Sequence, residues 1–80
     1  MIPGHKGYVK TSIFFTTYDS SVANEIYGNI ASKYKVLNYV RSKVVKELYF
    51  IEVEGNVKEF VEELLKGRVI WYKVDVLEFK

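Results

Sequence analysis

The spacing of hydrophobic residues changes its period several times along this 80-residue chain, and the order of these periods limits the folds that it can adopt. Apolar residues at every second position predict β-strands over residues 8–18, 36–45, 49–54 and 69–79. Apolar residues at steps of three and four positions predict amphipathic helices over residues 22–34 and 57–65. The predicted order is therefore strand, helix, strand, strand, helix, strand, with a short turn at 45–47 that joins the middle strands into a hairpin.

Capping and turn residues mark the ends of both helices. The run Asp-Ser-Ser at 19–21 supplies three candidate N-caps for the first helix. Asn56, followed three positions later by Glu59, resembles a capping box for the second helix, and Gly67 occupies its natural C-terminal cap position. Gly28 lies in the middle of the first helix, where it costs about 1 kcal/mol relative to alanine or marks a close approach to the sheet.

This order of elements is the split β-α-β pattern of a ferredoxin-like βαββαβ sandwich, an α+β fold. Right-handed crossovers place both helices on one face of a four-stranded antiparallel sheet with strand order 4-1-3-2. Residues 8–80 are expected to form a single domain, because 80 residues suffice for one hydrophobic core and are too few for two. Residues 1–7 are expected to form a flexible N-terminal tail.

No helix covers the other face of such a sheet, and the alternation of residues predicts what this face carries. Each strand contributes one large aromatic residue. These residues are Phe14, Tyr39, Phe50 and Trp71, with Arg41, Lys43 and Lys73 among them. The same alternation turns Asn38 and Ser42 toward the helices, where they either bond to backbone groups or line a ligand pocket.

An apolar patch of this size is near the upper limit for soluble monomers, so we expect another molecule to cover it. One interpretation is a second copy of the chain or a partner domain. Another is a stacking platform for the unpaired bases of single-stranded RNA, and a third is a ligand platform. Glu52 and Glu54 place negative charge where phosphates would lie, and residues 47–53 lack the basic-Gly-aromatic opening of the ribonucleoprotein signature. We therefore rank a homodimer above nucleic acid binding.

Composition removes most classes of enzyme. The chain has no cysteine and a single histidine, His5, which excludes thiolate metal sites, cysteine nucleophiles and multi-histidine clusters. His5 also lies in the expected tail, and the sequence contains neither a P-loop nor a dinucleotide fingerprint. We therefore expect a protein that is not an enzyme and has no catalytic residues, no metal and no cofactor.

The charge balance and hydropathy constrain the surroundings of the protein. Twelve Lys and Arg residues against ten Asp and Glu residues leave a formal charge of +2, too small to favour duplex nucleic acid or a membrane surface by electrostatics. No stretch approaches the roughly 18 apolar residues of a membrane span, and the first residues lack the apolar region of a secretion signal. We expect a cytoplasmic protein without membrane contact, with a residue usage that resembles heat-adapted proteins.

Four segments carry a resemblance to a known family. They are Ser-Ile-Phe-Phe at 12–15, the helix at 26–36, Asn-Tyr-Val-Arg-Ser-Lys-Val at 38–44 and Phe-Ile-Glu-Val-Glu-Gly at 50–55. In these segments the chain resembles the NIL domain, a small ferredoxin-like module named for an Asn-Ile-Leu motif at the start of its second strand. Asn38 of this motif is present, whereas Tyr39 and Val40 replace the isoleucine and the leucine.

The resemblance implies regulation and no catalysis. NIL domains occur at the C-terminus of the ATPase of bacterial methionine importers, where they bind methionine, and beside iron–sulfur ferredoxin domains in archaeal-type proteins. For this chain it implies a stand-alone regulatory module that senses a small amino acid such as methionine through a homodimer interface. The candidate ligand-binding residues are Asn38, Tyr39 and Arg41, with Arg41 suited to a carboxylate.

Overall fold

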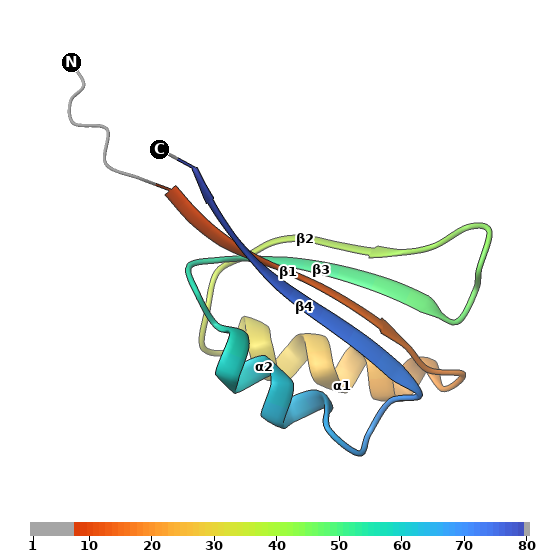
Figure 1. The fold of residues 1–80 in the computed structure, drawn as a ribbon. Coiled ribbons are helices and arrows are strands. Elements are labelled where there is room, and N and C mark those ends of the chain that lie inside the picture. The colour runs from red at the N-terminus through yellow and green to blue at the C-terminus, as the bar shows by residue number, and fades with distance from the viewer. Residues whose placement is uncertain (1–7, 80) are drawn as a thin grey trace.

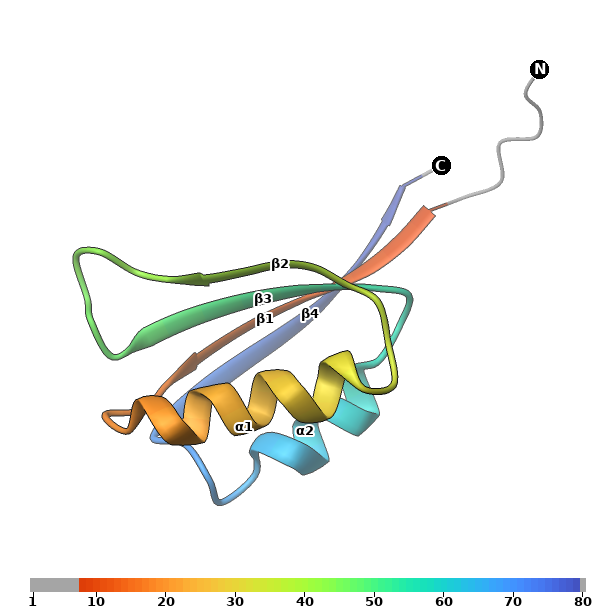
Figure 2. The ribbon, with the colours of Figure 1, turned by 180° about the vertical axis from the view of Figure 1, so that it is seen from behind.

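The computed structural model describes residues 8–79, which contain four strands and two helices in the predicted order (Figure 1). The elements are β1 (Tyr8–Thr16), α1 (Ser20–Ala31), β2 (Val36–Arg41), β3 (Leu48–Glu54), α2 (Lys58–Leu65) and β4 (Trp71–Phe79). The strands form one antiparallel sheet in the order β2-β3-β1-β4, and both helices lie on the same face of it (Figures 1 and 2). The predicted α+β ferredoxin-like fold is therefore confirmed. The expected tail at residues 1–7 lies outside the described residues.

The central strand β1 sets the faces of its neighbours. Ile13 pairs with Ile51 of β3 on one side and with Val74 of β4 on the other. Paired residues of antiparallel strands point to the same side of the sheet, so this row faces the helices and forms the centre of the core. The buried hydrophobic residues of the core are Ile13, Phe15, Ala23, Ile26, Ile30, Tyr49, Ile51, Val53, Val57, Val61, Leu65 and Val74.

A bulge in β2 reverses the side to which most side chains of this strand point. Val36 pairs with Val53 of β3, whereas Asn38 pairs with the adjacent residue Glu52. Two steps along β2 therefore correspond to one step along β3, and Tyr39 joins Val36 on the helix side. The predicted orientations of Asn38 and Tyr39 assumed an unbroken alternation, and both are wrong for this reason.

The second strand is shorter than predicted, because the residues after Arg41 form a turn that local hydrogen bonds stabilise. The Ser42 hydroxyl oxygen accepts hydrogen bonds from the backbone N–H groups of Val44 at 3.2 Å and Val45 at 2.9 Å. Such side-chain bonds offer the backbone an alternative to the strand ladder. Arg41 Nε donates to the carbonyl of Lys46 at 2.7 Å across the same loop. The connection from β2 to β3 is consequently longer than the predicted turn, and Ser42 holds it together instead of facing the helices.

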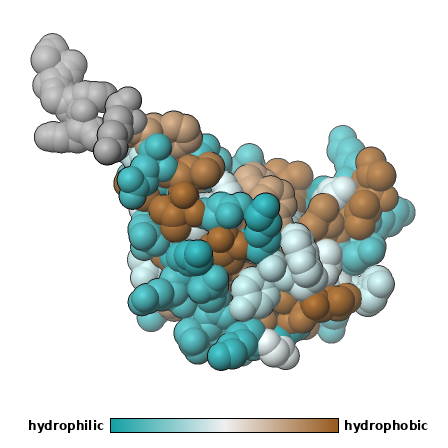
Figure 3. All heavy atoms as spheres, in the orientation of Figure 1, coloured by the Kyte–Doolittle hydropathy of each residue, from teal (hydrophilic) through white to brown (hydrophobic). Residues whose placement is uncertain are grey.

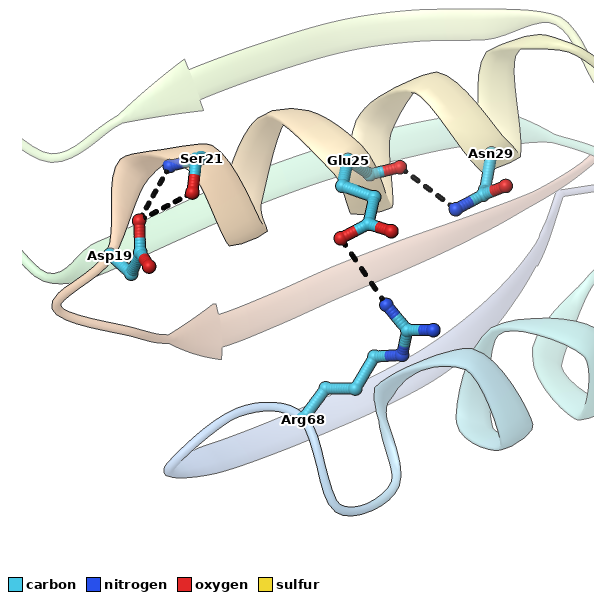
Figure 4. A network of polar contacts seen from close by, with 5 residues as sticks. All are labelled: Asp19, Ser21, Glu25, Asn29 and Arg68. Atoms are coloured by element: carbon cyan, nitrogen blue, oxygen red, sulfur yellow. Dashed lines mark hydrogen bonds and ion pairs between the residues drawn. The ribbon is translucent and has the colours of Figure 1, made fainter.

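Asp19 is the N-cap of α1, within the predicted run. Its carboxylate accepts hydrogen bonds from the backbone N–H of Ser21 at 2.9 Å and from the Ser21 hydroxyl at 2.7 Å (Figure 4). These bonds hold the pKa of the Asp19 carboxyl below its usual range. Further along the helix, Glu25 forms an ion pair with Arg68 at 3.5 Å, and its carbonyl accepts a bond from the Asn29 amide (Figure 4). The loop after α2 is thereby held beside α1, although an exposed ion pair contributes little energy.

Thr11 of β1 connects the end of β3 to the start of α2. Its hydroxyl donates to the Gly55 carbonyl at 2.7 Å and accepts a hydrogen bond from the backbone N–H of Val57 at 3.0 Å. Thr11 is fully buried, so these two bonds satisfy a hydroxyl that would otherwise be costly. The N-cap residue of α2 is Val57, and the Asn56 side chain bonds only to a backbone N–H two residues on. The predicted capping box between Asn56 and Glu59 is therefore wrong.

Gly28 and Gly67 differ in whether a residue with a side chain could replace them. Gly67 follows the C-cap Lys66 with a φ of +75°, a conformation that residues with a side chain rarely adopt, in agreement with its predicted capping position. Gly28 lies inside α1 without a positive φ, and a Cβ atom there would meet no atom within 4 Å. A close approach of helix and sheet therefore does not explain Gly28.

The substitution Gly28→Ala is expected to raise the free energy of unfolding by about 0.5–1 kcal/mol, because alanine lowers the backbone entropy of the unfolded chain where the fold has room for a methyl group. Urea unfolding followed by circular dichroism measures the change. Gly67→Ala is the matched control and is expected to lower stability, since alanine would have to adopt the positive φ. Equal effects of the two substitutions would contradict this account.

Candidate functional site on the open sheet face

The face of the sheet opposite the helices carries the candidate site, and no described helix or strand covers it (Figures 1 and 2). The strand register aligns two rows of side chains on this face. The first row is Val40, Phe50, Phe14 and Lys73, and the second is Leu48, Thr16 and Trp71. We call the hydrophobic members of these rows the aromatic patch. It consists of Phe14, Val40, Leu48, Phe50 and Trp71.

The aromatic patch is apolar and partly accessible, since Phe14 and Phe50 are half-buried and Trp71 is exposed. Phe14 and Phe50 are neighbours on the two central strands, with ring centroids 4.9 Å apart and ring planes inclined by 36°. Trp71 at the rim is 50% exposed. Hydrophobic residues also gather over the β2–β3 hairpin and where β4 begins (Figure 3), and here Val44 is 90% and Ile70 is 60% exposed. Partly exposed aromatic clusters of this kind are typical of surfaces that another molecule covers.

Beyond the patch, the open face carries charged residues beside the exposed hydrophobic residues Tyr8, Leu77 and Phe79, and most of its charges are paired. Lys10 forms an ion pair with Glu52 across β1 and β3, and Lys73 lies 3.7 Å from Asp75 along β4. Glu54 is opposite Lys10 in the register. These five residues leave the face with more acidic than basic side chains, so it does not attract phosphate groups electrostatically.

Three of the four aromatic residues predicted for the open face lie on it. They are Phe14, Phe50 and Trp71, and Lys73 accompanies them as predicted. The predicted placement of Tyr39 is wrong, because the bulge in β2 turns this residue toward the helices and gives its place on the open face to Val40. Arg41 also points to the helix side, opposite Tyr49, and Lys43 lies in the loop after β2.

The three predicted ligand-binding residues do not converge on one point. Asn38 lies on the open face, whereas Tyr39 and Arg41 lie on the helix side. The Tyr39 hydroxyl donates to Asn24 Oδ1 of α1 at 3.1 Å, and its ring stacks on Tyr27 with centroids 4.5 Å apart. Burial raises the pKa of the Tyr39 hydroxyl, and the neighbouring tyrosines add to the rise. Tyr39 thus joins α1 to the edge strand β2.

Within residues 8–79, Tyr49 of β3 places an unpaired polar group on the buried helix side of the sheet. Its side chain is 3% exposed, and its hydroxyl has no hydrogen-bond partner among the described residues. The ring stacks on Phe15 with centroids 5.3 Å apart, and the Arg41 guanidinium lies 5.4 Å from the ring centroid. A buried hydroxyl without a partner costs about 1–3 kcal/mol, so its retention calls for a reason. The sequence does not indicate that this hydroxyl is buried without a partner, since tyrosines are common in strands.

An open depression of about 600 Å³ lies at the N-terminal end of α2 and contains none of the predicted ligand residues. It is lined by Tyr34, Asn56, Val57, Lys58, Glu59 and Phe60. Within residues 8–79, no three His, Cys, Asp or Glu side chains are grouped so that they could hold a metal ion. The two described helices are also too short and too polar to cross a membrane.

Comparison with known proteins supports the fold. No protein-family model and no curated protein matches the chain. The chain is similar to the solved structure of LarC2, the C-terminal domain of a cyclometallase involved in the synthesis of the NPN cofactor of lactate racemase, in its apo form. The TM-score is 0.54 at 8% sequence identity, and the match covers 94% of this chain and 57% of that chain.

At this identity the similarity shows a common fold and carries no chemistry from one protein to the other. The chain also spans little more than half of the LarC2 structure. The name cyclometallase applies to the protein that contains LarC2. The resemblance to NIL domains is consistent with the fold and stays a prediction at the level of the family.

The substitution Tyr49→Phe is expected to raise the free energy of unfolding by about 1 kcal/mol, because it removes an unpartnered buried hydroxyl and keeps the ring that stacks on Phe15. Tyr39→Phe is the matched control and is expected to lower stability by about 0.5 kcal/mol, since it loses the hydrogen bond to Asn24. Chemical denaturation measures both. A loss of stability in the Tyr49 variant would mean that its hydroxyl is satisfied in solution.

Proposed function

We propose that this chain is a non-catalytic regulatory module that acts as a homodimer, in which the aromatic patch is buried against the same patch of a second copy. The observation that carries the proposal is the Phe14–Phe50 pair with Trp71 beside it on a face that no described element covers. A two-fold contact needs a surface that is complementary to itself, and a sheet face with an apolar area meets this need.

The size of the open face suits such an interface. Four strands about 4.8 Å apart, paired over about seven residues that rise about 3.4 Å each, give roughly 450 Å² in projection. Because side chains protrude from the sheet, its accessible area is larger than this projection and approaches the roughly 800 Å² that each partner of a standard interface buries. The aromatic patch fills one half of this face. The other half combines the Lys10–Glu52 ion pair with the exposed Leu77 and Phe79, so it offers both polar and apolar contacts.

The pair of phenylalanines also supports a second candidate function, the binding of single-stranded RNA. Phe14 and Phe50 hold adjacent positions on the two central strands, an arrangement on which bases stack in RNA-binding sheets. Three acidic side chains outnumber two lysines on the same face, so phosphates would meet net negative charge. The homodimer is therefore the better supported of the two functions.

Replacing Phe14 and Phe50 together by alanine is expected to weaken the homodimer about 30- to 1,000-fold, because truncating each central aromatic anchor costs about 1–2 kcal/mol. Light-scattering mass over a concentration series measures the affinity. The matched control is Tyr18→Ala, which removes an aromatic side chain that is 81% exposed outside the sheet and should leave the affinity unchanged.

An unchanged dimer affinity in the double variant would contradict the homodimer through this face. If the variant remains dimeric and loses affinity for a single-stranded RNA oligonucleotide, the second candidate function gains support.

We further propose that the module binds a small amino acid such as methionine, with the ligand carboxylate on Arg41. Arg41 is exposed and forms no ion pair within residues 8–79. Its Nε is held by the Lys46 carbonyl and its guanidinium lies over the Tyr49 ring, which fixes the group and leaves its terminal nitrogens for a planar carboxylate. The unpartnered Tyr49 hydroxyl and Tyr39 belong to the same cluster, whereas Asn38 lies on the opposite face.

The proposed ligand can be detected as a rise in the thermal midpoint of unfolding in a panel of amino acids that includes methionine, because a ligand that binds only the folded state stabilises it. Arg41→Ala is expected to abolish this rise, and Arg41→Lys to reduce it, since lysine cannot form the two parallel bonds. Lys43→Ala, in the exposed loop, is the matched control. The assignment of Arg41 is wrong if its alanine variant responds like the unmodified protein.

A further inference from the structure

We propose that β4 is a second self-association surface, and that it pairs edge to edge with β4 of another copy about a two-fold axis through Val74. This contact is distinct from the homodimer through the aromatic patch, because it uses the free backbone groups at the side of the sheet. Four observations support it: the direction of those groups, the length of the edge, the order of charges along it and its partly exposed hydrophobic residues.

The direction of the backbone groups follows from two hydrogen bonds of β1. The N–H of Gly55 donates to the carbonyl of Val9 at 2.8 Å, and the N–H of Thr17 donates to the carbonyl of Glu47 at 2.9 Å. These bonds show that the odd-numbered residues of β1 bond to β3. Because the backbone groups of an antiparallel strand alternate between its two neighbours, the even-numbered residues of β1 bond to β4.

In β4, the partners of those even-numbered residues are Trp71, Lys73, Asp75, Leu77 and Phe79. The residues between them, Tyr72, Val74, Val76 and Glu78, therefore direct their N–H and C=O groups to the free edge. No hydrogen bond among residues 8–79 outside the sheet uses these groups, and no element lies beyond β4 in the sheet (Figures 1 and 2).

Nine residues form this edge, which is long for an unprotected strand. Proteins usually block such edges with a lysine, a proline or a bulge, because an open edge is a template for another strand. Here Lys73 lies near the middle of the edge, but Asp75 lies two positions further on the same face. The pair makes the edge complementary to itself, and the side chains of Lys73 and Asp75 are 60% and 45% exposed.

One register of β4 against itself satisfies the charges as well as the backbone. With the axis through Val74, Lys73 lies opposite Asp75 of the second copy, and Asp75 opposite Lys73. An axis through Tyr72 or Val76 would place these charges opposite hydrophobic residues, and an axis through Lys73 or Asp75 would oppose like charges. The Val74 register also makes Lys73–Asp75 a pair without mutual backbone bonds, the type in which side chains come closest.

The same register joins hydrophobic side chains that are incompletely buried in the single chain. On the open face, Trp71, which is 50% exposed, meets Leu77 of the second copy, which is 38% exposed. On the helix side, the half-buried Tyr72 meets the half-buried Val76. Charge, backbone bonding and hydrophobic contact thus select the same arrangement, a continuous sheet of twice the width.

Charge exchange tests this arrangement. Lys73→Glu and Asp75→Lys each place like charges opposite one another twice, and the double variant K73E/D75K restores the opposite pairs. We expect each single variant to weaken edge association about 10-fold and the double variant to recover it. The measurements are made in the Phe14→Ala/Phe50→Ala background, so that the open-face dimer does not contribute. Lys58→Glu on α2 changes the net charge by the same amount as Lys73→Glu and is the matched control for that variant.

Amide hydrogen exchange of the unmodified chain supplies an independent readout. Protection of Tyr72, Val74 and Val76 should rise with protein concentration, whereas Lys73 and Asp75, already bonded to β1, should not change. Contact through the open face offers no partner to the outward amides, so it cannot produce this pattern. Concentration-independent exchange at residues 72, 74 and 76, or a double charge variant as weak as the single variants, would overturn the edge pairing and leave the open-face homodimer standing.

Discussion

The hydrogen bonds of β1 to both of its neighbours organise the rest of the molecule. Odd-numbered residues of β1 bond to β3 and direct their side chains to the helices, where Ile13 and Phe15 are fully buried. Thr11 on the same side binds Gly55 and Val57 and so determines where α2 begins. Even-numbered residues bond to β4 and direct Phe14 to the open face. A single strand therefore fixes the core, the start of the second helix and the centre of the aromatic patch.

This arrangement leaves a predictable set of surfaces uncovered. Two helices cover only one face of the four-stranded sheet, and residues 8–79 contain no further helix or strand for the other face. The open face and the free edge of β4 are both consequences of that shortage. In such a small domain, much of the apolar surface is necessarily accessible, and association is one way to bury it.

Hydrophobic periodicity is enough to predict the elements, their order and the topology of this fold, because each period reports which face of an element is buried. Periodicity also predicts correctly that Phe14, Phe50 and Trp71 face away from the helices, because these residues lie on regular strands. Periodicity fails at Tyr39, since a one-residue bulge after Val36 reverses the phase of β2 without changing the composition. Leu48 could have been found by extending the third strand one residue toward the N-terminus.

Other errors come from contacts between residues that are distant in the sequence. The N-terminus of α2 is determined by the Thr11 hydroxyl, 46 positions before Val57, so a local capping motif around Asn56 gives the wrong answer. The unpartnered Tyr49 hydroxyl depends on what surrounds it on three sides, which no local pattern encodes. Sequence patterns therefore predict the periodic part of the fold and one face of the site, and they miss the polar contacts that tertiary packing creates.

The two proposed contacts are compatible with one closed assembly. Edge pairing about Val74 has its two-fold axis perpendicular to the sheet, whereas packing of two open faces has its axis in the plane between them. Where these perpendicular two-fold axes intersect, they generate a closed tetramer in which each contact is used twice and which does not extend into a filament. Trp71 belongs to both contacts and would lie where they meet. Arg41 lies on β2, at the opposite edge of the sheet, so a ligand there stays accessible in the assembly, and any influence on the contact at β4 must pass through the packing of β3 and β1.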